Sequence, residues 1–485
     1  MINAKQKLCG VLIPVFSLRR SGDLGIGDTE AVRDAIEFCT RNNMSVLQVL
    51  PINETSGDNS PYNAISSTAL DPVLCTVEPR LIPGLDEADY KRLIAESGIE
   101  QLDANSVHYP VVKQLKLNIF KAAWANFRLE IAADKTDATR EFKDFEREHA
   151  DWLPAYTLYR TLIDVHNGCW SQWQAEVQNY ASAKKWLAKA PEQDKLNDSC
   201  RFAAFMQWLA FKQWKELRLF ADSKGVKLMG DIPFGVSRFS ADVWSQGSLF
   251  DLKWSGGAPP EPFFQADEFT RKWGQNWGIP IYNWPAHEAR NYQWWRQRVR
   301  CLTDVFHFFR IDHVLGFFRM YAFPWIPERN GEFLELSEEE AEELTGGLWP
   351  QFLPRADEPA KNAALNESDG AKLLKMIMEA SGQSSVIAED LGMVPEYVRP
   401  LIHKLGIPGF AIPIFERNEE DRSFKKKDEL HPLSLVTYGT HDHWPLAMYY
   451  EDLVARWHGP DGHEAWRDVQ RLMAFLELDE ENPPT

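Results

Sequence analysis

Short apolar runs rich in β-branched residues recur along this 485-residue chain, and most end in a polar residue. Runs of this kind are typical of buried β-strands. Amphipathic helical patterns precede three of them, at 29–42, 203–222 and 371–380. Because strands that alternate with helices form parallel sheets, the pattern predicts an α/β fold. The predicted strands are 10–16, 45–50, 226–231, 305–312, 385–389, 410–415 and 434–440.

The spacing of these strands predicts a TIM (β/α)8 barrel, a closed ring of eight parallel strands. Seven strands are recognisable, so the eighth either escapes the pattern or is missing at the C-terminus. Two gaps between strands are too long for simple crossovers. We therefore expect a single catalytic barrel domain over 1–485, with a helical subdomain inserted at 71–200 and a second subdomain at 323–372. Within the second, Ser337 and Glu340 fit a helix capping box.

Three carboxylates lie at the ends of strand-like runs, namely Asp312, Glu389 and Asp442. In a parallel barrel the active site is built at the C-terminal strand ends, so acids from separate strands converge on one pocket. Two or three converging carboxylates can break a glycosidic bond. The strand ends therefore predict an enzyme that acts on sugars.

Arg310 and Asp312 are two residues apart in a predicted strand, so their side chains share one face. A neighbouring guanidinium favours the ionised form of a carboxylate, which suits a nucleophile. The alternative is that Arg310 and Asp312 form a buried ion pair that has no catalytic role.

Glu389 and Asp390 are adjacent in a strand end, so only one of them can face the barrel interior. If Glu389 faces Asp312, repulsion and burial would keep it protonated, as a general acid requires. Asp390 is suitably placed to cap the turn into the next helix. The alternative is an ordinary corner between a strand and a loop.

The run His441, Asp442, His443 could be taken for a metal site. Adjacent histidines in an extended strand point to opposite faces, and no HExxH pattern occurs in the chain, so we expect no metal there. Asp442 as an anion that binds the sugar is the simpler interpretation.

Two loop-like segments follow predicted strands and are expected to line the substrate. The first contains Ser60 and Tyr62, which offer a hydroxyl and an aromatic face at a turn. The second runs over 256–261 and leads into 274–278. The alternative is that both are ordinary loops rich in glycine and proline.

The amino-acid composition argues against several classes of function. The net charge of −18 makes nucleic-acid binding unfavourable, and no apolar run is long enough to span a membrane. The first ten residues lack the apolar core of a secretion signal, and the six cysteines form no CxxC pair. We therefore expect a cytoplasmic protein with reduced cysteines. The 19 tryptophans suit sugar stacking, although most are expected in the core.

Taken together, the motifs resemble the 4-α-glucanotransferases of the amylomaltase or disproportionating-enzyme type (glycoside hydrolase family 77), and are closest to the plant-cytosolic type. They occur in family order over nearly the whole chain. The matching segments are 10–14, 23–27, 60–62, 230–234, 275–278, 310–313, 388–392, 405–409 and 440–442.

The resemblance implies a retaining transfer of α-1,4-glucan segments between maltooligosaccharides or glucans, without a cofactor. Asp312 would be the nucleophile, Glu389 the general acid and base, and Asp442 the stabiliser of the transition state. Arg310, His313 and His441 would orient the nucleophile and the donor sugar. The residues implied at the sugar subsites are Ser60, Tyr62, Glu261, Gln275 and Trp277.

Two other functions stay open at this point. An α-glucan hydrolase would share the same intermediate, because water and a sugar hydroxyl compete for it. A catalytically inactive glucan-binding fragment is the other alternative, since the chain ends before the family's final strand.

Overall fold

The computed structural model describes residues 7–103, 105–133, 136–261, 267–460 and 462–484. The chain divides into two compact units, Lys7–Ser385 and Val386–Thr485. Within the described residues, no helix combines the length and apolarity that crossing a membrane requires.

A parallel sheet forms the centre of the first unit. Its strands are β1 (Gly10–Leu12), β2 (Val46–Gln48), β3 (Lys227–Ile232) and β6 (Phe308–Ile311), hydrogen-bonded in that order. Most residues of β2, β3 and β6 are buried, as expected for a parallel sheet whose two faces are both covered. The register places Asp231 of β3 opposite Arg310 of β6. Two polar side chains from separate strands therefore meet at one end of the sheet.

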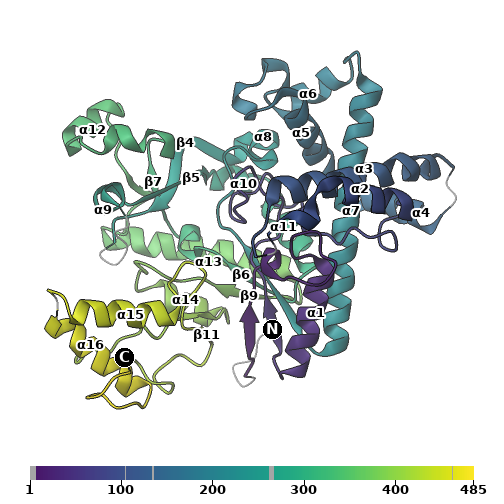
Figure 1. Cartoon of the computed structure of the whole chain (residues 1–485). Helices are drawn as coiled ribbons and strands as arrows, with labels where there is room; N and C mark the ends of the chain where they lie inside the picture. Colours follow the sequence, from purple (N-terminus) through teal and green to yellow (C-terminus); the bar gives the residue numbers. More distant parts are fainter. Residues whose placement is uncertain (1–6, 104, 134–135, 262–266, 461, 485) are drawn as a thin grey trace. The chain divides into compact units, whose positions relative to one another are not determined.

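Helices connect these strands, as the sequence pattern predicts. α1 (Thr29–Arg41) lies between β1 and β2, α7 (Gln193–Lys224) precedes β3, and α11 (Gln293–Thr303) precedes β6. Asp28 caps α1 by accepting a hydrogen bond from the backbone of Ala31. α7 is one long helix that packs along α1 (Figure 1).

The segment predicted as a helical insertion is helical. It contains α2 (Glu87–Ser97), α3 (Tyr109–Ala133), α4 (Asp137–Glu148), α5 (Leu153–His166) and α6 (Tyr180–Leu187). α7 then continues through residue 200 without a break, so the helical region and the sheet share one element. Leu158, Tyr159 and Leu162 of α5 pack with Trp173 and Trp244 into a buried cluster.

Four strands that the pattern did not predict form a separate antiparallel sheet, in the order β5-β4-β7-β8. They are β4 (Phe250–Ala258), β5 (Gln275–Tyr282), β7 (Met320–Phe323) and β8 (Gln351–Leu353). The expectation of loops at 256–258 and 275–278 was wrong, because the glycines there sit inside paired strands. At Gly257 a side chain would collide with the carbonyl of Gln275, so the close pairing requires glycine.

Among the remaining helices of the first unit, two agree with features predicted from the sequence. α8 (Ala241–Ser245), α9 (Glu268–Trp273) and α10 (Trp284–Ala289) are short. α12 (Glu338–Leu344) begins with the predicted capping box between Ser337 and Glu340, which is confirmed. α13 (Ala360–Ser381) includes the predicted helix at 371–380.

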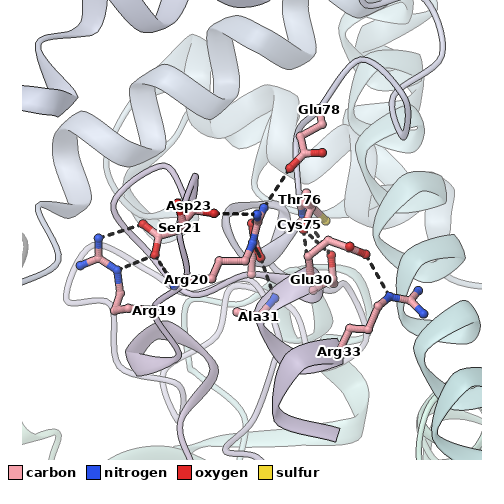
Figure 2. Close-up of polar contacts among 12 residues, drawn as sticks. Arg19, Arg20, Ser21, Asp23, Glu30, Ala31, Arg33, Cys75, Thr76 and Glu78 are labelled. Atoms are coloured by element: carbon pink, nitrogen blue, oxygen red, sulfur yellow. Dashed lines mark hydrogen bonds and ion pairs between the residues drawn. The ribbon is translucent and has the colours of Figure 1, made fainter. Parts of the chain in front are cut away.

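The loop between β1 and α1 is held by ion pairs, as Figure 2 shows. The guanidinium of Arg20 donates to Asp28 at 2.9 Å and to Glu78 at 3.0 Å. Arg19 donates to Asp23 at 2.8 Å, and Asp23 in turn accepts from the backbone of Gly25. These contacts join the loop to the segment that follows β2.

The second unit contains most of β9 (Ser385–Ala388), α14 (Val398–Lys404), and the parallel pair β10 (Gly409–Ala411) and β11 (Ser434–Val436). The backbone of Ala388 donates to the carbonyl of Pro408, which places the end of β9 next to the start of β10. α15 (Leu446–Trp457) and α16 (Gly462–Phe475) pack on Phe424 to form the core of this unit. All seven predicted strands therefore exist, and the α/β class is confirmed.

Candidate active site

Arg310 is the centre of a buried polar cluster at the C-terminal ends of β3 and β6. Its Nη2 donates to Oδ1 of Asp312 at 2.7 Å, and its Nη1 donates to Oδ2 of Asp231 at 2.6 Å. Arg310 is almost fully buried, whereas about a quarter of the Asp312 side chain, 27%, is exposed. One guanidinium thus spans two carboxylates, of which that of Asp312 is partly open to solvent. The predicted pairing of Arg310 with Asp312 is confirmed.

Tyr62 completes this cluster from the loop after β2. Its hydroxyl donates to Oδ2 of Asp231 at 2.6 Å and accepts from Nη1 of Arg310 at 3.3 Å. Burial and the adjacent Asp231 raise the pKa of Tyr62 far above its ordinary value, so the hydroxyl stays protonated and remains a donor. Tyr62 therefore supports the arginine as well as offering a ring.

The turn that carries Ser60 and Tyr62 is fixed by Asp58. Its Oδ1 accepts from the backbone of Ser60 at 3.0 Å, and its Oδ2 accepts from Nδ2 of Asn63 at 2.8 Å. The hydroxyl of Ser60 accepts from the backbone of Tyr62 at 3.3 Å. This is the local hydrogen bonding by which Asp and Ser stabilise turns.

His313 follows Asp312 in a left-handed backbone conformation, with φ of 43°. Its ring lies between two aromatic rings, with the centroid of Trp277 at 4.8 Å and that of Phe234 at 6.2 Å. Burial lowers the pKa of His313 to about 4, although the neighbouring Asp312 acts in the opposite direction. The imidazole is therefore neutral at neutral pH and can both donate and accept a hydrogen bond.

β5 brings Gln275 and Trp277 to this site on one face of the strand. Nε1 of Trp277 donates to Oε1 of Gln275 at 3.0 Å, and the Trp277 side chain is 38% exposed. The intervening Asn276 points the other way and bonds Ser255 and Asn330. β4 ends at Ala258, which pairs with Gln275, and Glu261 follows three residues later.

In the second unit, Glu389 follows β9 directly and is 8% exposed. Its Oε1 accepts from the backbone of Leu391 at 3.0 Å. Asp390 caps no helix, contrary to expectation. Its Oδ1 accepts from the backbone of Phe410 at 2.6 Å and its Oδ2 from Arg399 at 3.0 Å, because β10 and α14 pack against the corner after β9.

Asp442 follows β11, which pairs with β10. Its carboxylate is exposed, with Nε2 of His441 at 3.4 Å from Oδ2. His443 bonds instead to the hydroxyl of Thr440. Within the part of the chain that the structure describes, no group of three His, Cys, Asp or Glu side chains is arranged to hold a metal ion.

Asp231 is the one residue of this cluster that sequence reasoning left without a role. The signal was present, since the predicted strand at 226–231 also ends in a carboxylate. Only the register of β3 against β6 shows that this carboxylate holds Arg310.

An arginine-bound carboxylate at the end of a parallel strand, with a partly exposed tryptophan nearby, is typical of enzymes that act on carbohydrates. The model of the 4-alpha-glucanotransferase family matches residues 13–483. A 4-alpha-glucanotransferase of Chlamydia caviae is 31% identical over 474 residues, which cover 96% of this chain and 77% of that protein. 4-alpha-glucanotransferase DPE2 of Oryza sativa is 35% identical over 354 residues, or 70% of this chain and 35% of the rice protein.

The fold agrees with these matches. Amylomaltase from Streptococcus agalactiae, solved in complex with acarbose, superposes with a TM-score of 0.70 at 23% identity. The superposition covers 97% of this chain and 88% of that structure. The chain therefore belongs to the 4-alpha-glucanotransferase family, whose members are glycosyltransferases acting on α-1,4-glucans, and the resemblance found in the sequence is confirmed.

Proposed function

We propose that Asp312, Glu389 and Asp442 together catalyse the transfer of α-1,4-glucan segments between maltooligosaccharides by a retaining double displacement. The observation that carries the proposal is the guanidinium of Arg310, which holds Asp312 at 2.7 Å and is itself paired with buried Asp231 at 2.6 Å. This arrangement fixes the orientation of a partly exposed carboxylate, which is what a nucleophile needs.

In the first step, a carboxylate oxygen of Asp312 bonds to the anomeric carbon of the donor glucan. Glu389 gives its proton to the glycosidic oxygen as that bond breaks. In the second step, Glu389 takes the proton of an acceptor 4-hydroxyl, the new glycosidic bond forms, and the ester to Asp312 breaks. Asp442 stabilises the positive charge that develops on the sugar ring. The mechanism requires the carboxyls of Asp312 and Glu389 to be about 5–5.5 Å apart.

We assign the remaining residues to orientation and binding. Arg310 positions Asp312, while His313 and His441 hydrogen-bond the hydroxyls of the donor sugar. Trp277 offers a partly exposed ring to the glucan. Gln275 holds this ring in place by accepting a hydrogen bond from Nε1 of Trp277. Ser60, Tyr62 and Glu261 complete the sugar subsites.

For the architecture, we propose that the parallel strands belong to a (β/α)8 barrel of the amylomaltase type, with the helical segment 71–200 and the segment 323–372 as subdomains that wall the cleft. We also propose a cytoplasmic location, because all six cysteines are free thiols, as a reducing compartment favours.

The test is the product pattern from pure maltotriose. A glucanotransferase yields a ladder of longer maltodextrins, whereas a hydrolase yields only glucose and maltose. The variant Asp312→Ala should form neither set of products while still binding maltooligosaccharide. Products limited to glucose and maltose would contradict the proposal, and so would undiminished turnover by Asp312→Ala.

A further inference from the structure

A pocket of about 150 Å³ opens in the first unit, between the start of α5 and helices α8, α10 and α11. Its floor is buried and includes Trp152, Asp242, His287 and Trp294. Its rim carries the exposed polar side chains of Asp151 and Arg290. The residues around Arg310 described above do not line it, so it is a separate cavity.

His287 is the unusual member of this lining. It is 1% exposed, and neither of its ring nitrogens has a hydrogen-bond partner within the described residues. Burial lowers the pKa of His287 to about 4, and the nearby backbone of Leu249, although it opposes this shift, does not reach hydrogen-bond geometry. The ring is therefore neutral and presents one donor and one acceptor. A buried polar group of this kind is costly to leave without a partner.

The carboxylate of Asp242 in the pocket lining does not need a bound cation to stabilise it. Its Oδ2 accepts from the backbone of Ser67 at 2.7 Å, and its Oδ1 accepts from the Ser67 hydroxyl at 2.7 Å and from Nε1 of Trp294 at 3.0 Å. Three donors thus already stabilise this buried carboxylate. The described residues also provide no cluster that would bind a metal ion here. A neutral ligand fits the charge of the lining.

The volume of the cavity and the aromatic residues in its lining further limit the kinds of ligand that it can bind. The cavity is well below the several hundred Å³ of ordinary drug-sized sites, so it suits a small ligand. Trp152, Tyr156 and Trp294 contribute aromatic faces of the kind that pack on the C–H faces of sugar rings.

We propose that this pocket binds one neutral, polyhydroxylated molecule the size of a single sugar ring, separately from the proposed catalytic site. A ligand hydroxyl can pair with one ring nitrogen of His287, which gives a partner to one of the two unpartnered atoms. The aromatic side chains then pack on the apolar face of the ring. The inference stands on the cavity itself and does not depend on the assignment of Asp312, Glu389 or Asp442.

The experiment is a calorimetric titration of the whole protein with glucose in the presence of excess acarbose. Acarbose is bound by the amylomaltase of Streptococcus agalactiae, so it should occupy the proposed catalytic site. Saturable binding of glucose is expected to persist. Ala155→Phe, which fills the pocket from α5, and His287→Phe, which removes both nitrogens, should each weaken this binding about tenfold or more.

Ala132→Phe is the matched control, because it adds the same ring at an exposed position of α3 and should leave glucose binding unchanged. His287→Phe breaks no hydrogen bond to the described residues, so it remains a fair test if Ala155→Phe does not fold. Turnover of maltotriose by each variant reports that the fold is intact. The proposal is overturned if glucose gives no saturable signal with acarbose present, if both pocket variants bind as the wild type does, or if crystals soaked in glucose hold only water in the pocket.

Discussion

Nη2 of Arg310 lies 2.7 Å from Oδ1 of Asp312, while the other arm of the same guanidinium lies 2.6 Å from Asp231. Asp231 is 2% exposed, and Tyr62 donates to the same oxygen that accepts from the arginine. A rigid, forked cation is needed to reach two carboxylates at once. The position of Asp312 therefore depends on β3, on β6 and on the loop after β2.

The first prediction concerns Arg310→Lys. A single ammonium keeps the charge but cannot span both carboxylates, so Asp312 should lose its fixed orientation. We expect kcat on maltotriose to fall on the order of 100-fold, with a smaller change in KM. Steady-state kinetics and circular dichroism measure activity and fold together.

Arg160→Lys is the control for this substitution. Arg160 also spans two carboxylates, those of Glu54 and Asp164, but lies on α5 outside the cluster around Arg310. Its replacement should leave kcat nearly unchanged. An Arg310→Lys enzyme with wild-type kcat would show that Arg310 does not position the nucleophile.

The second prediction concerns Trp277. More than a third of this side chain is exposed, so Trp277→Ala should change the free energy of unfolding by less than about 0.5 kcal/mol. Loss of the ring should raise KM for maltooligosaccharides roughly two- to tenfold. Trp277→Phe keeps an aromatic face and should restore most of the affinity.

Phe38→Ala removes another exposed aromatic side chain, on α1, and should leave KM unchanged. If Trp277→Ala and Phe38→Ala have the same KM as the wild type, Trp277 does not line a glucan subsite.

The third prediction concerns the loop in Figure 2. Arg20→Met removes the guanidinium that hydrogen-bonds buried Asp28, whereas Arg80→Met removes an arginine that is 57% exposed. We expect a loss of about 3 kcal/mol in unfolding free energy for Arg20→Met and less than about 1 kcal/mol for Arg80→Met. Urea unfolding at neutral pH gives both values. Equal losses would mean that the buried pair contributes no more than the exposed one.

The fourth prediction concerns pH and Asp71, which accepts hydrogen bonds from Thr55 at the start of the loop that carries Tyr62. Burial, reinforced by Glu54, raises the pKa of Asp71 from 3.8 to about 6. The native state therefore holds its proton more tightly than the unfolded state does. The resulting stabilisation is complete below pH 4 and is lost as the pH rises through 6.

Asp71→Asn cannot ionise and should lack this dependence. Between pH 4 and pH 7, the unfolding free energy of the wild type should fall relative to that of Asp71→Asn by about 3 kcal/mol, the equivalent of moving a pKa from 3.8 to about 6. Asp34→Asn changes an exposed site on α1, so its unfolding free energy should depend on pH in the same way as that of the wild type. Parallel curves for the wild type and Asp71→Asn would contradict an elevated pKa in the native state.

Hydrophobic patterning was sufficient for strands such as β6 and β9 because their residues are mostly buried and form continuous apolar runs. β4 and β5 escaped prediction for a physical reason. Their glycines and prolines usually mark loops, but here Gly257 allows the backbone of β4 to approach Gln275 closely. Strand propensity alone cannot show which glycines allow two paired strands to approach each other closely.

The same limit applies to the candidate site. Period-two alternation was enough to pair Arg310 with Asp312, because both lie on one strand. Asp231 required the register between two strands that are far apart in the sequence. Asp390 was misassigned as a helix cap because its partners, Phe410 and Arg399, come from later elements.

The central claim is that Asp312 forms a covalent bond to the glucan and that Glu389 is needed to release it. Glu389→Gln incubated with α-maltosyl fluoride tests this directly, because fluoride departs without a proton while the acceptor hydroxyl lacks its base. Mass spectrometry of the digested protein should find a maltosyl ester on the peptide containing Asp312. A maltosyl group on a different residue, or no adduct although the wild type consumes the fluoride, would contradict the account.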